Sequence, residues 1–287
     1  IVSVPSSERA AIAIEPWNAG FTLVADAFSK DRAFIAGDAA HLFTPTGGMG
    51  YNTSVDDAVN LGWKLAAVIQ GWAGESLLDS YEAERKPIGH RNTAFARSMA
   101  DSIGSIKAPP NVDDDTPEAH DVRQKMGAAL HQHVRNEFNI PGLQLGLRYE
   151  DSPIVAAEEG VPTPDQPNTY IPTSRPGSRA PHLWLGDASI FDLFGRDFTL
   201  LCFGEPGSTA SRAALATWTV CAAAAGMPLE VLHCDSAEGR ALYEAACVLI
   251  RPDHHIAWRG SPDADAAVVL AMACGRTPLP ANTPVAA

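Results

Sequence analysis

The stretch of sequence that decides the fold is residues 33–64, AFIAGDAAHLFTPTGGMGYNTSVDDAVNLGWK. It opens with a short apolar run at 33–36, which predicts an inner strand. Gly37 and Asp38 come directly after that run, so a carboxylate stands where the strand ends. Because a carboxylate accepts hydrogen bonds, Asp38 can bind the hydroxyl groups of a ligand. The sequence therefore predicts a ligand-binding edge immediately behind the strand.

A glycine-rich turn at 45–50 follows, and its three glycines let the backbone approach a ligand closely with its N–H groups turned toward it. A helix is predicted next, because Ser54 with Asp57, or Thr53 with Asp56, has capping-box spacing. The apolar stripe of this helix comprises Val55, Ala58, Val59, Gly62, Leu65, Ala66 and Ile69. We expect the helix to be buried on most sides, with its positive end directed into the turn.

Three consecutive motifs carry a family resemblance: GDAAH from Gly37, P-x-GG-x-G-x-N from Pro45 and D-A-x-N-L-x-W-K-L from Asp57. Together they resemble the FAD-dependent aromatic hydroxylases, the single-component flavoprotein monooxygenases that include phenol and para-hydroxybenzoate hydroxylases. The alternative interpretation is a strand-turn-helix of an unrelated α/β protein, in which Asp38 is a surface carboxylate.

The resemblance implies a role for each part of the stretch. Asp38 would bind the ribityl chain of FAD, and residues 45–52 would lie along the pyrophosphate and the flavin ring. The helix N-terminus would face the pyrimidine edge, where reduced flavin is negatively charged. The cofactor-binding residues are then Gly37, Asp38, Pro45, Gly47, Gly48, Met49, Gly50, Tyr51 and Asn52, with Pro45 also in the catalytic position.

Composition limits the possible functions of these 287 residues. With 21 lysines and arginines against 34 aspartates and glutamates, the net charge of −13 disfavours nucleic acid and anionic membranes as partners. No apolar run of 18 residues and no signal-peptide pattern occurs, so we expect neither a membrane span nor secretion. The five cysteines, at 202, 221, 234, 247 and 274, fit no disulfide framework and no metal pair. We therefore expect a cytoplasmic protein without a metal and with a small-molecule partner.

The N-terminal residues predict strands at 11–14 and 21–28, which the resemblance places at the end of a substrate-binding sheet. Ile1 opens the chain in the middle of a pattern, and no G-x-G-x-x-G dinucleotide fingerprint occurs anywhere. The chain therefore looks like the C-terminal half of an enzyme. It would carry one wall of the flavin site and would need the missing N-terminal half as a partner.

A second helix is predicted from about 77 to 102, interrupted by Pro87, and a third at 118–139. The inner face of the second helix comprises Leu77, Leu78, Tyr81 and Ile88, and that of the third comprises Val122, Met126, Ala129 or Leu130, Val134 and Phe138. On the second helix, Arg85, Arg91 and Arg97 are interpreted as a solvated face in preference to substrate or NADPH contacts. His131 and His133 point away from each other on a helix and are not a metal pair.

Prolines recur from 153 to 181 and predict an extended surface linker. Beyond it, predicted strands at 198–203, 229–233, 248–251 and 255–258 alternate with helices at 208–225, 237–245 and 263–274. This order, with P-H-L-W-L, D-L-F-G and R-P-D-H-H-I-A-W-R, resembles the thioredoxin-like C-terminal domain of the phenol hydroxylase branch. A redox-active thioredoxin needs two thiols at 204–208, where none occurs, while Cys202 lies inside the strand. An interaction or dimerisation module is the better interpretation. His254 and His255 face opposite ways on a strand, and core or surface roles are preferred to metal ligation for them.

The predicted fold is therefore α/β: the C-terminal part of a FAD-binding domain followed by a thioredoxin-like domain. The expected parts are 1–30, the end of the substrate sheet; 31–150, the FAD-binding part; 151–181, the linker; and 182–287, the thioredoxin-like domain. The resemblance implies a monooxygenase that uses FAD, NADPH or NADH, and O₂ to hydroxylate a phenolic or other aromatic substrate, and that could form a homodimer. The other hypothesis is a non-catalytic fragment or interaction protein that kept this fold.

Overall fold

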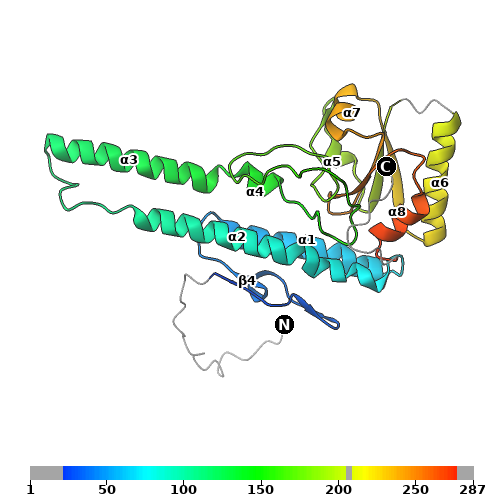
Figure 1. Ribbon diagram of the computed structural model, residues 1–287, viewed down its shortest axis with the longest axis horizontal. Helices are drawn as coiled ribbons and strands as arrows, with labels where there is room; N and C mark the ends of the chain where they lie inside the picture. The colour runs from blue at the N-terminus through cyan, green and yellow to red at the C-terminus, as the bar shows by residue number, and fades with distance from the viewer. Residues whose placement is uncertain (1–21, 205–208, 277–287) are drawn as a thin grey trace, which may run out of the picture.

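The computed structural model describes residues 22–204 and 209–276. The predicted strand at 11–14 and most of the segment 204–208 lie outside these residues. At one end of the molecule a sheet is flanked by helices, and at the other end two helices reach outward side by side (Figure 1). The predicted α/β class is confirmed.

The N-terminal strands are short. β1 (Leu23–Val24) pairs with β4 (His41–Leu42), and β2 (Ser29–Lys30) pairs with β3 (Ala33–Phe34), both antiparallel. The predicted inner strand at 33–36 is wrong for the described residues, because β3 has β2 as its one partner there and Ala33 is exposed. A short 3-10 turn, η2 (Gly37–Ala39), follows it.

Helix α1 (Met49–Ile69) begins earlier than the capping pattern suggested. Gly48, in the left-handed conformation with φ of 63°, is its N-cap. The expected capping boxes are wrong: Ser54 lies inside the helix and donates from Oγ to the carbonyl oxygen of Gly50 at 2.9 Å. The glycine turn, which itself supplies the required backbone conformation, sets the start of the helix.

The buried face of α1 differs from the predicted one. The exposed fractions of Val55, Val59 and Ile69 are 42%, 52% and 82%, so the apolar stripe is solvent-facing among the described residues. The buried residues are Met49, Thr53, Asp57, Asn60, Lys64 and Ala67. The expectation of a helix buried on most sides was wrong because α1 packs on α2 and η2 with its polar face.

The long arm in Figure 1 consists of α2 (Asp79–Ser105), which follows η3 (Glu75–Leu77), and α3 (Pro117–Phe138). Leu77, Tyr81 and Ile88 are buried as predicted, and α2 continues through Pro87. On α3 the predicted apolar face is rotated: Val134 and Phe138 are exposed, whereas Ala119, His133 and Glu137 are buried. Two polar side chains of α3 therefore point inward. The short α4 (Pro141–Leu145) follows.

The C-terminal part contains a four-stranded sheet of order β10-β9-β7-β8. Its strands are β7 (Phe198–Phe203), β8 (Leu229–Cys234), β9 (Cys247–Ile250) and β10 (Ile256–Gly260), and only the β7–β8 pair is parallel. The other elements here are β5 (Trp184–Leu185), β6 (Ala188–Ser189), α5 (Ile190–Leu193), α6 (Thr209–Ala225), α7 (Ala237–Tyr243) and α8 (Ala266–Ala273). Helices α6 and α8 pack together on one face of the sheet, with α5 and α7 on the other (Figure 1). The predicted thioredoxin-like order of elements is confirmed.

The linker and the first helices share the core of this sheet. Residues 151–181 form no helix and no named strand, as predicted, but Ile154 and Ala156 are buried in the same cluster as Phe198. Trp72, which follows α1, packs edge-on against Phe198 with ring centroids 6.2 Å apart. The description of 151–181 as a surface linker is therefore wrong for its first residues. The domain boundaries remain a prediction.

The sheet also brings two cysteines together. Cys202 on β7 and Cys247 on β9 are register partners, and their sulfur atoms lie 3.3 Å apart as free thiols. Among the described residues no group of three or more His, Cys, Asp or Glu side chains could hold a metal ion. No helix in that part of the chain is long and apolar enough to cross a membrane.

Candidate flavin-binding wall

The centre of the candidate site is the turn between β4 and α1. Gly47 and Gly48 both have φ of 63°, a conformation that glycine adopts without strain. A Cβ atom at Gly47 would lie 3.4 Å from the ring of Phe95, whereas one at Gly48 would meet only the side chain of Asn52 at 4.0 Å. The turn is therefore packed on its Gly47 side and open on its Gly48 side.

Three helices each hold one residue of this turn. From α2, the carbonyl oxygen of Ala96 accepts from the Thr46 hydroxyl at 2.5 Å. From α3, Glu137 Oε1 accepts from the Gly47 N–H at 2.7 Å. From α1, Asn52 donates to the carbonyl oxygen of Gly48 at 2.7 Å. The turn is consequently fixed from three sides before any ligand is added.

The N-terminus of α1 opens on this turn and has no side-chain cap. A helix of 21 residues leaves its first N–H groups without intrahelical partners and has partial positive charge at that end. Such an end binds anionic groups through its N–H donors. In the described part of the chain this helix end has no side-chain cap, so its backbone donors are suited to bind an anionic group.

The turn that carries Asp38 is fixed by a buried carboxylate. Asp57 on α1 accepts through Oδ2 from the Gly37 N–H at 3.0 Å and lies 2.7 Å from His41 Nε2, and its Oδ1 accepts from Arg85 Nε at 2.7 Å. Asp38 itself is exposed. Asp57 thus binds the Gly37 backbone before Asp38 and the His41 side chain after it, and the Asp38 carboxylate stays exposed.

Arg85 was expected on a solvated face, and this expectation is wrong. Its side chain is fully buried, and besides Asp57 it donates to the Tyr149 hydroxyl at 2.9 Å and to the Thr53 carbonyl oxygen at 3.2 Å. Burial would raise the pKa of Asp57, but the His41 hydrogen bond and the Arg85 charge outweigh burial and lower that pKa. Asp57 is therefore held ionised. The expectation is confirmed for Arg97, which is exposed and pairs with Asp101.

The other predicted site residues have different environments. Pro45, Tyr51 and Asn52 are exposed, and Tyr51 retains 80% of its accessible surface. The Met49 side chain is buried in a core cluster, so this residue can offer a ligand only its backbone. Gly50 packs against Phe43. The structure brings the predicted residues into one turn and helix end, and their contact with a flavin stays a prediction.

Sequence reasoning missed several polar residues behind this wall, above all Asp57, Arg85, His133 and Glu137. One signal was present: His133 and Glu137 are spaced i,i+4, so both side chains lie on one face of a helix. The sequence alone gave no sign that this face meets the glycine turn.

A buried ion cluster of Lys64, Glu84, Arg251 and Asp253 joins the wall to the C-terminal sheet. Glu84 Oε2 lies 2.6 Å from Lys64 Nζ, and both Glu84 oxygens accept from Arg251, at 2.6 and 2.9 Å. Arg251 also donates through Nε to Asp253 at 3.0 Å. All four side chains are at most 3% exposed, and their charges balance. Removing one member of such a buried ion pair destabilises the fold, because its partner is left buried with an uncompensated charge.

The pKa shifts in this cluster follow from burial and pairing. Burial lowers the pKa of Lys64 to about 8, although the Glu84 carboxylate acts in the opposite direction. Burial would raise the pKa of Glu84, but the Arg251 and Lys64 charges prevail and lower it to about 2. Glu84 is therefore ionised at neutral pH.

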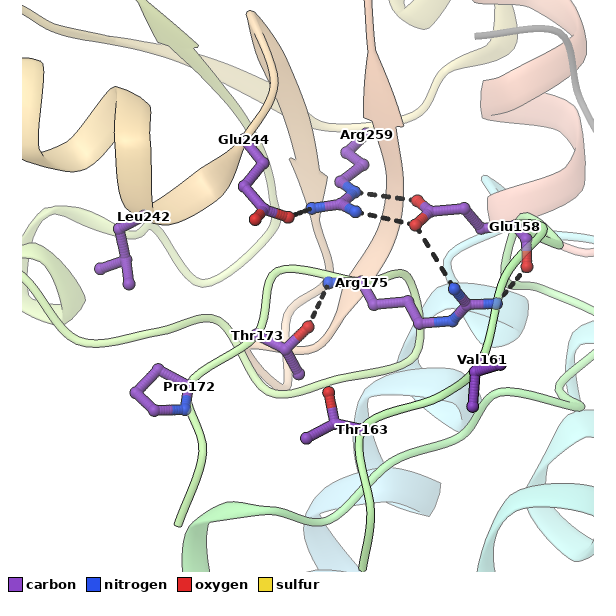
Figure 2. Close-up of a pocket in the computed structure, with 9 residues that line it drawn as sticks. All are labelled: Glu158, Val161, Thr163, Pro172, Thr173, Arg175, Leu242, Glu244 and Arg259. Atoms are coloured by element: carbon purple, nitrogen blue, oxygen red, sulfur yellow. Dashed lines mark hydrogen bonds and ion pairs between the residues drawn. The ribbon is translucent and has the colours of Figure 1, made fainter.

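A hollow of about 280 Å³ lies beside β10, away from the glycine turn (Figure 2). Arg259 pairs with Glu158 at 2.7 Å and with Glu244 at 2.9 Å, and Arg175 lies 3.6 Å from Glu158. Because each guanidinium already faces a carboxylate, these residues attach the 158–175 segment to β10. We assign them a structural role.

Comparisons with known proteins agree with this geometry. Residues 4–96 match the family described as FAD binding domain, and residues 173–277 match the family described as aromatic-ring hydroxylase, C-terminal. These two matches cover separate parts of the chain, and both families belong to the description of flavin-dependent aromatic hydroxylases that the sequence motifs suggested.

Curated relatives include 4-methyl-5-nitrocatechol 5-monooxygenase of a Burkholderia species, 36% identical over 94% of this chain and 48% of the relative. The FAD-dependent monooxygenase apdD of Emericella nidulans is 36% identical over 80% of this chain and 38% of the relative. Phenol 2-monooxygenase of a Pseudomonas species is 33% identical over 80% and 42%. The chain thus spans less than half the length of these relatives.

Two solved structures are also similar. RebC soaked with chromopyrrolic acid, with bound 7-carboxy-K252c, superposes with a TM-score of 0.79 at 39% identity, over 88% of this chain and 48% of RebC. The flavin-dependent monooxygenase PieE, in complex with FAD and substrate, superposes with a TM-score of 0.77 at 30% identity, over 91% and 50%. The fold therefore matches that of flavin-dependent hydroxylases.

Proposed function

We propose that this chain forms one wall of the FAD site of a monooxygenase that hydroxylates a phenolic or other aromatic compound, with NADPH or NADH as electron donor and O₂. The observation that carries the proposal is the uncapped N-terminus of α1, which opens on the glycine turn close in sequence to the exposed Asp38. The relatives, among them phenol 2-monooxygenase, support this choice of reaction. A bound flavin would supply the electron transfer and the oxygen activation.

The residues of this chain would act by binding and orientation. Asp38 would accept hydrogen bonds from the ribityl hydroxyl groups, which orients the cofactor along the wall. The N–H groups of Gly48, Met49 and Gly50 would stabilise negative charge at the pyrimidine edge of the flavin. Pro45, at the start of the glycine turn, would occupy the position that the family resemblance assigns to catalysis. The remainder of the site, including a dinucleotide fingerprint, would come from a segment equivalent to the N-terminal half of the relatives.

The absorbance of bound flavin tests this division of the site. We expect the 287-residue chain alone to purify without flavin, because it lacks the fingerprint that binds the ADP half of FAD. The same chain joined to the N-terminal half should purify yellow. A colourless joined protein would contradict the proposed function and favour a non-catalytic protein. A yellow sample of the chain alone would contradict the proposed division of the site.

Replacing Asp38 tests the ribityl assignment in the joined protein. Asp38→Ala should weaken FAD binding by about 1.5 to 3 kcal/mol, the contribution of a hydrogen bond to a charged group, with unchanged thermal unfolding. Asp26, another exposed carboxylate of the same region, offers the matched control Asp26→Ala. Equal FAD affinity in Asp38→Ala and the control, measured by fluorescence titration, would disprove the assignment.

A further inference from the structure

Two paired polar side chains of α3, His133 and Glu137, lie beside the glycine turn, and Glu137 contacts it directly. His133 and Glu137 retain 5% and 8% of their accessible surface, so both are more than nine-tenths buried. His133 Nε2 lies 2.8 Å from Glu137 Oε2. Buried polar side chains cost free energy unless they are paired, and here each satisfies the other.

The other oxygen of Glu137 acts on the turn itself. Its Oε1 accepts from the Gly47 N–H at 2.7 Å, while Gly47 holds φ of 63° with the Phe95 ring close by. Both carboxylate oxygens of Glu137 are thus engaged, which restricts the side chain to one orientation. The position of the Gly47 backbone is set by that orientation.

The hydrogen-bonded chain continues to α2. His133 Nδ1 lies 3.1 Å from the Ser102 hydroxyl, so Ser102, His133, Glu137 and Gly47 form one series across α2, α3 and the turn. The outer end of the arm, where α2 ends and α3 begins, is far from the C-terminal sheet in Figure 1, and this series links α2 and α3 to the turn before α1. The arm therefore has a role at the candidate site beyond packing.

We propose that Glu137, held by His133, is a positioning residue for the flavin: it sets the backbone of the glycine turn on which the cofactor rests. The inference builds on the proposed function and adds to it the residue that orients the turn. Glu137 already uses the Gly47 N–H, so the donors left for the cofactor are those of Gly48 and the first turn of α1. Glu137 acts through the turn and does not touch the flavin.

The test compares Glu137→Ala with Glu137→Gln in the protein joined to its N-terminal half. The alanine variant loses the acceptor for the Gly47 N–H, and we expect FAD binding to weaken about ten- to a hundredfold with a shifted flavin absorption spectrum. The glutamine amide keeps an acceptor for Gly47 and can donate to His133, so it should restore both properties. Asp121→Ala, which removes an exposed carboxylate from the same helix, is the matched control.

The melting curve of Glu137→Ala, measured by circular dichroism, shows whether this variant folds. A second variant with a smaller change keeps the test valid if it does not. Ser102→Ala removes only the partner of His133 Nδ1, and a smaller spectral shift in the same direction is expected. Unchanged affinity and spectrum in both Glu137→Ala and Ser102→Ala would overturn the inference. So would a glutamine variant as impaired as the alanine variant. If the unmodified joined protein binds no FAD, the proposed function fails, and this inference fails with it.

Discussion

The two faces of α1 reverse the usual distribution of polarity. The face toward α2 buries Asp57, Asn60 and Lys64, whereas the opposite face leaves Val59 and Ile69 half or more exposed. Most soluble helices bury their apolar stripe and expose charges. The buried polar face of α1 therefore links this helix to other parts of the molecule through hydrogen bonds and ion pairs.

Each buried charge of α1 fixes a different part of the molecule. Asp57 holds the turn before Asp38, and Lys64 holds Glu84, which in turn binds Arg251 of the C-terminal part. Trp63 adds a hydrogen bond from its indole N–H to Asp253 at 3.1 Å. The exposed apolar face has no such partner among the described residues. We therefore expect substitutions on the two faces to differ strongly in effect.

The largest effect is expected for Glu84→Ala. This change leaves Lys64 and Arg251 buried without their shared carboxylate, and removing one member of a buried ion pair costs about 3 to 5 kcal/mol. Urea unfolding of the chain measures the loss. The matched control is Glu75→Ala, an exposed carboxylate four residues before α2 begins, which should change stability by less than about 0.5 kcal/mol. A loss below about 1 kcal/mol in Glu84→Ala would show that the cluster does not connect the two parts.

The second largest effect is expected from acid, which should lower the free energy of unfolding that Glu84 contributes. Because the pKa of Glu84 is about 2 in the folded chain and 4.5 ordinarily, its pairing stabilises the fold fully above pH 4.5. That stabilisation is lost as the pH falls from 4.5 toward 2, by about 3 kcal/mol in total. Urea midpoints of the unmodified chain and of Glu84→Gln, measured across this range, should converge as the pH falls. Parallel curves would mean that Glu84 is not ionised in the folded state.

An intermediate effect is expected where the buried face meets Arg85. Arg85→Lys cannot keep the bonds to Asp57, Tyr149 and Thr53 together, because lysine lacks the planar fork of arginine, and should cost about 2 kcal/mol. The exposed Arg97 on the same helix offers the control Arg97→Lys, which should be neutral within about 0.5 kcal/mol. Thermal unfolding compares them. Equal unfolding midpoints for Arg85→Lys and Arg97→Lys would show that the buried arginine contributes no more to stability than the exposed one.

The smallest effect belongs to the exposed apolar face. Val59→Ser should change the stability of the 287-residue chain by less than about 0.5 kcal/mol, since 52% of the side chain is already exposed. If the proposed N-terminal half covers this face, the same change should weaken the binding of that half supplied as a separate chain. Calorimetric titration measures the binding. Ser98→Ala on an exposed part of α2 is the control, and equal affinities for both variants would show that Val59 lies outside the contact.

Much of the C-terminal fold was predictable because its signals are local. The run 198–203 is apolar except for Thr199 and forms a strand with those same bounds, and the strands and helices after it occur in the predicted order. The glycine turn was likewise predictable, because three glycines within four residues limit what the backbone can do. Residues 45–52 therefore lie in one turn and the helix start that follows it, and their role as a flavin site stays a prediction.

The sequence by itself determined the class of fold, the glycine turn and the presence of a helix after it, since these depend on neighbouring residues. Only the tertiary structure decided which face of α1 is buried and that Glu137 holds Gly47. It also decided that Glu84 meets Arg251, 167 positions along the chain, and that Cys202 meets Cys247. The physical reason is that helical period shows which side chains share a face, whereas the partner of that face depends on packing between distant segments.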